Sequence, residues 1–212
     1  MNEQFVPTPV GSARLDWYPA AGTRMATAVL GHGNASGVEA ADLQGLAQAL
    51  PPLGVTVVLV TQPYRLEGNP GVGASRPSTR AWTAVWPRVS GHGTPVIAGG
   101  RSAGSQVACR TAATLGAEAV LALAYPLLGP GSPAELLATD RPTLVIQGGR
   151  DPFGRPDQFP PLPVDMELVT IPSAGHMFSA GAAGGGPPEV AQLTAAVIEW
   201  LDWRMRLVSP VG

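Results

Sequence analysis

A serine flanked by glycines is the first feature of this sequence whose residue types and spacing suit chemistry. Residues 100–104 read Gly-Arg-Ser-Ala-Gly, and they lie where an apolar run at residues 95–98 gives way to helical spacing from residue 103. A serine on such a sharp strand-to-helix turn projects its hydroxyl from the sheet, and the N-terminus of the following helix favours a nearby oxyanion. By itself the motif also suits a glycine-rich turn with a capping serine. Ser102 is therefore a candidate nucleophile.

An acid and a histidine follow Ser102 at positions that suit a Ser-His-Asp triad. Asp151 comes after a strand predicted at residues 143–147, and His176 comes after a strand predicted at residues 167–171. Asp151 alone is equally typical of a turn, and His176 alone is equally typical of a hydrogen-bonded structural histidine. Together, in the order serine, acid, histidine and each after a strand, they favour His176 as the base and Asp151 as the acid that orients it.

An oxyanion hole needs two N–H donors, one from the residue after the nucleophile and one from a loop after an early strand. Ala103 supplies the first. Residues 31–35, Gly-His-Gly-Asn-Ala, follow a strand predicted at residues 27–30. We expect Asn34 to be the second donor, with Ala35 as the alternative, because the neighbouring glycines let the backbone approach a substrate closely.

The same loop has a second interpretation as a dinucleotide-binding turn, because residues 31–36 show G-x-G-x-x-S spacing after a strand. The end of the next predicted strand, Val60-Thr61-Gln62, offers no carboxylate for a ribose hydroxyl, which disfavours that interpretation. We expect His32 to hold the shape of the loop through hydrogen bonds. His92 lies in a glycine-flanked turn and is expected to be exposed to solvent.

The elements that must position these residues alternate along the chain. Short runs rich in Val, Leu and Ile alternate with segments of helical spacing, which predicts an α/β fold: a mostly parallel twisted sheet with helices on both faces. An edge strand is predicted at residues 13–18, and residues 62–78, rich in Pro and Gly, are predicted to be irregular. The remaining predicted strands are at residues 27–30, 55–60, 95–98, 120–124, 143–147 and 167–171, and the predicted helices are at residues 38–50, 79–89, 103–115, 133–138 and 189–207.

Composition limits the chemistry and the partners. A length of 212 residues predicts one domain spanning residues 1–212. The net charge of −2 argues against a nucleic-acid partner, and without a long apolar run we expect no membrane association and a cytoplasmic protein. The chain contains no Lys, which excludes a Schiff base, a Ser-Lys dyad and lysine-held pyridoxal phosphate. The single Cys109 excludes an internal disulfide, and with only three histidines we expect no metal site.

Three segments together resemble the α/β-hydrolase superfamily: Gly-Gly-Arg-Ser-Ala-Gly at residues 99–104, Gly-Gly-Arg-Asp-Pro-Phe-Gly at residues 148–154, and Gly-His-Met-Phe at residues 175–178. Within it the chain resembles the small lidless dienelactone-hydrolase-like branch, which includes bacterial relatives of testis-expressed protein 30. The resemblance implies hydrolysis of an ester, thioester or related acyl bond of a small substrate, without a cofactor. Dienelactone hydrolases have cysteine as nucleophile, so Ser102 does not carry over their particular substrate.

Residues 125–141 are too short for a large helical cap, which predicts an open site unless residues 62–78 cover it. Tyr64, Arg65, Tyr125 and Phe178 are candidates for the substrate rim, with ordinary loop packing as the alternative. Because a fold does not determine a function, the alternative to an enzyme is a non-catalytic scaffold acting through a protein partner. The oligomeric state stays open.

Overall fold

The computed structural model describes residues 1–68, 75–129, 132–178 and 187–208, except the side chains of residues 75–77, 187 and 203–208. Eight strands form one sheet in the order β1-β2-β4-β3-β5-β6-β7-β8. The first two strands form an antiparallel hairpin, β2 also pairs antiparallel with β4, and all other neighbours are parallel. The strands are β1 (Asn2–Thr8), β2 (Gly11–Tyr18), β3 (Ala26–Gly31), β4 (Val55–Thr61), β5 (Val96–Arg101), β6 (Ala119–Leu123), β7 (Thr143–Gly148) and β8 (Met166–Ile171).

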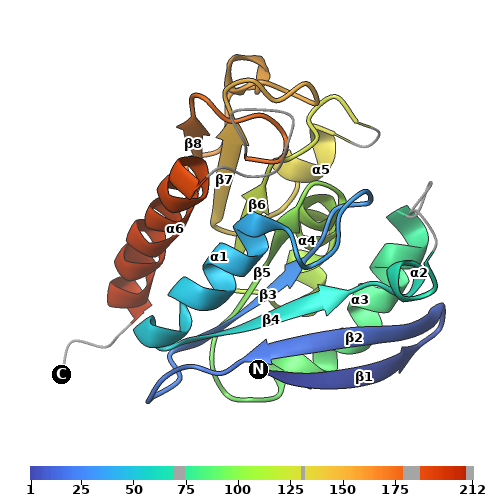
Figure 1. Ribbon diagram of the computed structural model, residues 1–212. Helices are drawn as coiled ribbons and strands as arrows, with labels where there is room; N and C mark the ends of the chain where they lie inside the picture. The colour runs from blue at the N-terminus through green and yellow to red at the C-terminus, as the bar shows by residue number, and fades with distance from the viewer. Residues whose placement is uncertain (69–74, 130–131, 179–186, 209–212) are drawn as a thin grey trace.

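Helices cover both faces of the sheet, as Figure 1 shows. One face carries α1 (Ala41–Ala49) and α6 (Pro187–Val208), and the other carries α3 (Ser75–Ser90) and α4 (Ala103–Leu115). The short helices are α2 (Pro63–Leu66) and α5 (Ala134–Leu137), and 3₁₀ turns lie at Pro51–Leu53 and Pro156–Gln158. This arrangement confirms the predicted α/β class. Among the residues described, no helix has the length and apolarity needed to span a membrane.

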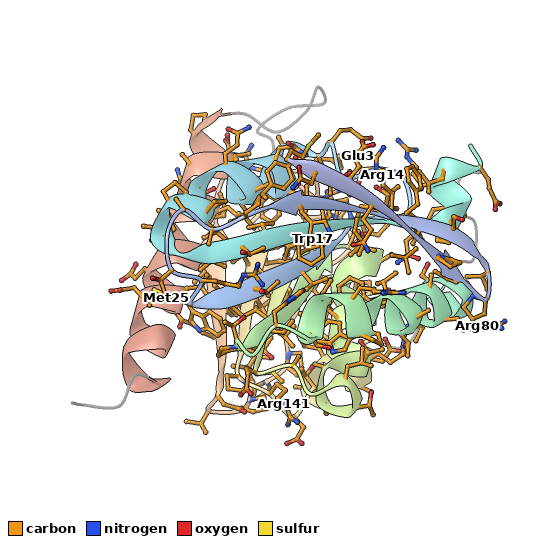
Figure 2. All side chains as sticks on the ribbon, turned by 90° about the horizontal axis from the view of Figure 1, so that it is seen from below. Glu3, Arg14, Trp17, Met25, Arg80 and Arg141 are labelled. Carbon is orange, nitrogen blue, oxygen red and sulfur yellow. The ribbon has the colours of Figure 1, made fainter. Side chains whose placement is uncertain are left out.

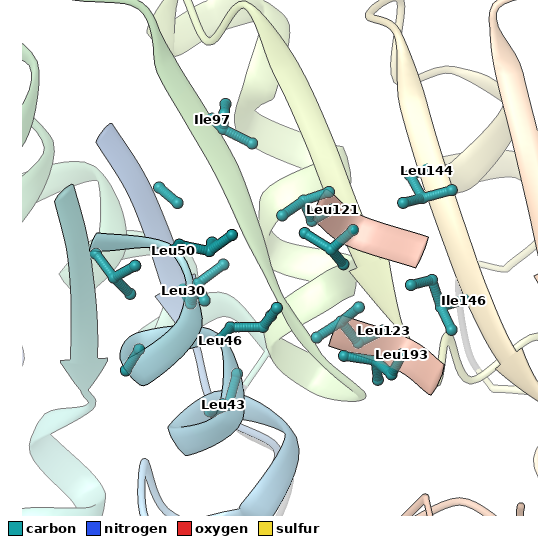
Figure 3. Packing of buried hydrophobic residues seen from close by; sticks show 14 of the residues in the cluster. Leu30, Leu43, Leu46, Leu50, Ile97, Leu121, Leu123, Leu144, Ile146 and Leu193 are labelled. Carbon is teal, nitrogen blue, oxygen red and sulfur yellow. The ribbon is translucent and has the colours of Figure 1, made fainter. Parts of the chain in front are cut away.

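Alternation along the strands divides the core into two clusters. In β6, Leu121 and Leu123 face the α1 and α6 side, whereas Val120 and Ala122 face the α3 and α4 side. Figure 3 shows the first cluster, where leucines of α1 such as Leu46 pack with those of the strands and of α6. Because both faces are covered, central strands are apolar at nearly every position, which is why they were recognisable in the sequence.

The N-terminal hairpin differs from the prediction. The strand predicted at residues 13–18 is β2, and it is not the edge, because β1 pairs along its outer side. The first four residues of β1, Asn-Glu-Gln-Phe, are all exposed, so no apolar alternation marks it as a strand. In Figure 2 the labelled residues Glu3, Arg14 and Trp17 lie along this hairpin.

Two further differences from the predicted boundaries concern segments next to the candidate site. β5 continues to Arg101, three residues beyond the predicted end, so the strand reaches the residue before Ser102. Within residues 62–78, predicted to be irregular, α2 occupies Pro63–Leu66 and α3 begins at Ser75; residues 69–74 lie outside the described part. The connection from β6 to β7 contains only α5 in its described residues, so the chain has no large cap there.

Candidate active site

Ser102 lies at the turn between β5 and α4. Its backbone has φ 52° and ψ −121°, a conformation that is strained for a residue with a side chain. The flanking glycines have a packing reason, since a Cβ on either Gly100 or Gly104 would fall on the carbonyl oxygen of Gly31 at the end of β3. The sharp turn therefore depends on close approach between two backbones, which holds the serine at the carboxyl end of the sheet.

His176 and Asp151 lie beside Ser102. The imidazole Nε2 of His176 is 3.0 Å from the Ser102 Oγ, and its Nδ1 is 2.8 Å from the Asp151 Oδ2. A carboxylate only accepts hydrogen bonds, so Nδ1 carries the proton and Nε2 presents a lone pair to the hydroxyl. The structure thus brings together three side chains that follow β5, β7 and β8, in a geometry suited to removing the hydroxyl proton.

The Asp151 carboxylate is buried and held from several sides. Besides the His176 imidazole, it accepts hydrogen bonds from the Phe153 backbone N–H at 2.8 Å and from the Gln147 side-chain amide at 3.0 Å. The same amide nitrogen lies 3.2 Å from the Tyr125 carbonyl and 2.7 Å from the Gly154 carbonyl. Gln147 was not among the predicted site residues, because its only mark in the sequence is a polar residue at the end of an apolar run.

Backbone hydrogen bonds join the loop of the acid to the loop of the histidine. The N–H of Gly149 donates to Ile171 at 2.9 Å, and the N–H of Arg150 donates to Ala174 at 2.9 Å. The two loops are so close that a Cβ on Gly149 would overlap the backbone of Pro172. Asp151 and His176 are therefore fixed relative to each other before any ligand arrives.

The loop after β3 passes directly beside the serine. A Cβ on Gly33 would lie 3.2 Å from the Cβ of Ser102. The His32 Nδ1 is 2.7 Å from the Gly33 carbonyl oxygen, and the His32 Nε2 is 3.0 Å from the backbone N–H of Gln62. Because that N–H donates to Nε2, the His32 proton sits on Nδ1 and bonds the Gly33 carbonyl. Burial lowers the pKa of His32, which favours this neutral form.

Asn34 and Ala35, the candidate N–H donors of the oxyanion hole, are exposed.

The structure corrects two of the predicted rim residues. Tyr125 and Phe178 are fully buried, Tyr125 in the core on the α3 and α4 side and Phe178 in the core on the α1 and α6 side. Large apolar side chains next to a core gain more by entering it than by facing water, so neither forms a rim.

The other two candidate rim residues lie nearer the surface. Tyr64 is half-buried with its ring edge-on to His32, and Arg65 is exposed and pairs with Glu39 at 2.9 Å.

Phe153 is an aromatic residue of the site that the sequence analysis did not single out. Its ring centroid is 4.5 Å from that of His176, and the residue is 51% exposed. An exposed phenyl ring beside the imidazole forms an apolar wall of the site. His92 lies elsewhere: it is exposed, as expected, and its ring contacts the edge of Trp17.

A family model described as an α/β hydrolase domain matches residues 24–201. The chain belongs to the α/β-hydrolase family. The predicted superfamily is thereby confirmed. No curated protein matches the chain.

Solved structures resemble this α/β hydrolase over nearly its whole length. An α/β serine hydrolase homologue from Coxiella burnetii is 18% identical, with a TM-score of 0.78 and coverage of 94% of this chain and 97% of that one. A serine hydrolase without a lid from Xanthomonas campestris is 23% identical, with a TM-score of 0.74 and 94% of both chains covered. Est1E from Butyrivibrio proteoclasticus is 13% identical, with a TM-score of 0.75 and coverage of 97% and 100%. At these identities the likeness shows the fold.

Proposed function

We propose that this α/β hydrolase is a serine hydrolase that cleaves an ester, thioester or related acyl bond of a small substrate through an acyl-enzyme on Ser102. The observation that carries the proposal is the chain of two hydrogen bonds, 3.0 Å from the Ser102 hydroxyl to the His176 imidazole and 2.8 Å from that imidazole to Asp151. Family membership supports hydrolysis in general. The side-chain geometry supports this particular mechanism.

In the acylation step, the His176 Nε2 accepts the hydroxyl proton while the Ser102 Oγ attacks the substrate carbonyl carbon. The resulting imidazolium is stabilised by the Asp151 carboxylate on Nδ1. The three groups already stand at hydrogen-bonding distance, so little of the barrier is spent on bringing them together.

Backbone N–H groups are proposed to stabilise the tetrahedral oxyanion. Ala103 is the first residue of α4, so its N–H has no acceptor within the helix. The Gly33 carbonyl accepts a hydrogen bond from His32. The Asn34 N–H belongs to the same peptide, and in a trans peptide the N–H points away from the C=O, so this N–H is directed away from His32. These two donors are the proposed oxyanion hole, in which loss of one donor typically lowers the rate about 10²- to 10³-fold.

To complete acylation, the His176 imidazolium donates its proton to the leaving oxygen or sulfur. Breakdown of the acyl-enzyme repeats these transfers, because the neutral imidazole removes a proton from water as that water attacks the acyl carbon and then returns the proton to the departing Ser102 Oγ. Ser102 is regenerated with its proton, and no other reactant is consumed. The absence of a large cap and the exposed Phe153 favour small acyl groups with an apolar part.

A fluorophosphonate probe tests the proposal. We expect the probe to label the folded wild-type protein but not Ser102→Ala, and we expect His176→Ala to label much more slowly. A panel of p-nitrophenyl and aryl-acid esters then defines the acyl group, including a ferulate ester, because Est1E has been solved with ferulic acid bound. If the correctly folded wild type is not labelled and hydrolyses no ester, a non-catalytic scaffold is the better description.

A further inference from the structure

Arg101 is a buried cation immediately before the serine. It is the last residue of β5, and only 2% of its side chain is exposed. The proposed mechanism assigns no role to Arg101. The hydrogen bonds of its side chain go to groups other than the Ser102 hydroxyl and the His176 imidazole. Removing a guanidinium from water is unfavourable unless its donors are paired, so its contacts require a reason.

The Arg101 guanidinium donates to three separate segments. Its Nε bonds the Asp42 carboxylate in α1 at 3.0 Å, and its Nη1 bonds the Ser36 hydroxyl in the loop after β3 at 2.7 Å. Its Nη2 bonds the backbone carbonyl oxygen of His176 at 2.7 Å and lies 3.0 Å from the Met177 sulfur. One planar group therefore joins the serine strand to the loop of the histidine and to the loop of the proposed oxyanion donor.

Charge pairing alone does not explain this arrangement. Asp42 is as buried as Arg101, and burial raises the pKa of its carboxyl while the neighbouring Arg101 opposes that shift. A buried ion pair of this kind adds little net stability compared with apolar residues of similar volume. The rigid fork of donors, by contrast, sets directions that an apolar group cannot set. The contacts beyond Asp42 point to a role in geometry.

We propose that Arg101 is a positioning residue, which holds the backbone of His176 and the Ser36 segment in place relative to Ser102. The inference rests on the proposed hydrolase function and deepens it. Because Arg101 is covalently adjacent to Ser102 and hydrogen-bonded to His176, it sets the separation of nucleophile and base independently of Asp151. Displacement of a catalytic group by 1 Å can lower a rate about 10²-fold.

A displaced His176 has a recognisable chemical signature. During acylation the imidazolium must protonate an alkoxide or phenoxide leaving group, whereas p-nitrophenoxide leaves without this help. If Arg101 positions the imidazole, its loss lowers kcat/KM for phenyl acetate more than for p-nitrophenyl acetate. A loss of folded protein would instead lower both values by the same factor.

Two variants of Arg101 separate these effects. The double variant Arg101→Met/Asp42→Leu removes both charges and leaves neither one buried without a partner. Arg101→Lys keeps the charge beside Asp42 but lacks the fork. For both we expect kcat/KM for p-nitrophenyl acetate to fall about 10-fold and that for phenyl acetate about 10²-fold, at full near-ultraviolet circular dichroism.

Arg110 in α4 provides the matched control. Its guanidinium pairs with the two Glu135 carboxylate oxygens at 2.8 and 3.1 Å and with the Thr79 hydroxyl at 2.8 Å, and none of these bonds goes to the loops of Asp151 or His176. We expect Arg110→Met/Glu135→Leu to lower the thermal midpoint and to leave the ratio of the two substrates unchanged.

The outcomes distinguish this inference from the proposed function. A wild-type substrate ratio in either folded Arg101 variant overturns the positioning role, and so does loss of the fold in both. If the wild type itself neither reacts with the fluorophosphonate nor hydrolyses these esters, the proposed function fails first. A wild type that is active, with Arg101 variants of equal activity and ratio, refutes the positioning role alone.

Discussion

The strained backbone of Ser102 makes a prediction about stability that does not depend on catalysis. Its φ of 52° with ψ −121° is a conformation that glycine adopts easily and that side chains disfavour. Replacing the serine by glycine is therefore expected to stabilise the fold relative to replacing it by alanine. Both changes remove the hydroxyl and its hydrogen bond to His176, so the difference between them contains only the backbone strain and the effect of glycine on the unfolded chain.

The expected magnitude follows from two opposing terms. A strained residue of this kind typically destabilises a fold by about 1–3 kcal/mol, and glycine relieves most of that. Glycine also increases the freedom of the unfolded chain, which lowers stability by about 0.4–1 kcal/mol relative to alanine. The net difference favours Ser102→Gly over Ser102→Ala by about 1 kcal/mol, or about 2–4 °C in thermal midpoint for a chain of this size.

Urea unfolding and calorimetry of the two variants measure this difference. Ser105, in the first turn of α4, supplies the control because its backbone is helical. There glycine is expected to be less stable than alanine by about 1 kcal/mol, the reverse of the order at residue 102. If Ser102→Gly is also less stable than Ser102→Ala, the backbone at the nucleophile is not strained and the reasoning is refuted.

Acidification is expected to weaken the loop after β3. Burial lowers the pKa of His32 below its ordinary 6.5, so the contribution of the neutral imidazole to stability is present above pH 6.5 and is lost as the pH falls through the lowered value. In urea unfolding above and below this pH, the free energy of unfolding should change less for His32→Asn than for the wild type. Gln147→Leu removes a buried donor from Asp151 and is expected to lower the free energy of unfolding by about 2–4 kcal/mol, whereas a loss below about 1 kcal/mol in urea would contradict that role. Phe153→Ala is expected to leave the thermal midpoint nearly unchanged and to lower kcat/KM for p-nitrophenyl esters about 2- to 10-fold, because the apolar wall 4.5 Å from the His176 ring is lost, and an unchanged kcat/KM would show that this wall does not contact the substrate.

The sequence was sufficient to predict the fold class and the edge of the sheet at which chemistry is proposed. Strands such as β4, buried at every position, read as continuous apolar runs because helices cover both faces. Parallel strands place their carboxyl ends along one edge, so the residues that follow β5, β7 and β8 all lie on loops at that edge. Ser102, Asp151 and His176 were therefore recognisable from their order in the chain.

The N-terminal hairpin shows where periodicity was insufficient. β1 has four exposed residues at its start, so its local sequence resembles a polar tail. It becomes a strand because β2, the next strand in the chain, offers a complete row of backbone partners, and β2 is itself fixed by pairing with the distant β4. Edge strands in general depend on pairing more than on their own apolar pattern.

The direction of side chains in the loops was decided only by packing. Tyr125 and Phe178 follow strands of the site, yet each enters a core, while Phe153 stays outside against His176. Arg101 joins Asp42 and His176 across separations of 59 and 75 residues. Local sequence determines where the buried strands and the turns occur, because those depend on neighbours in the chain. Which buried groups from different loops contact each other depends on segments distant in sequence. The contacts of Arg101 were therefore revealed only by the folded structure.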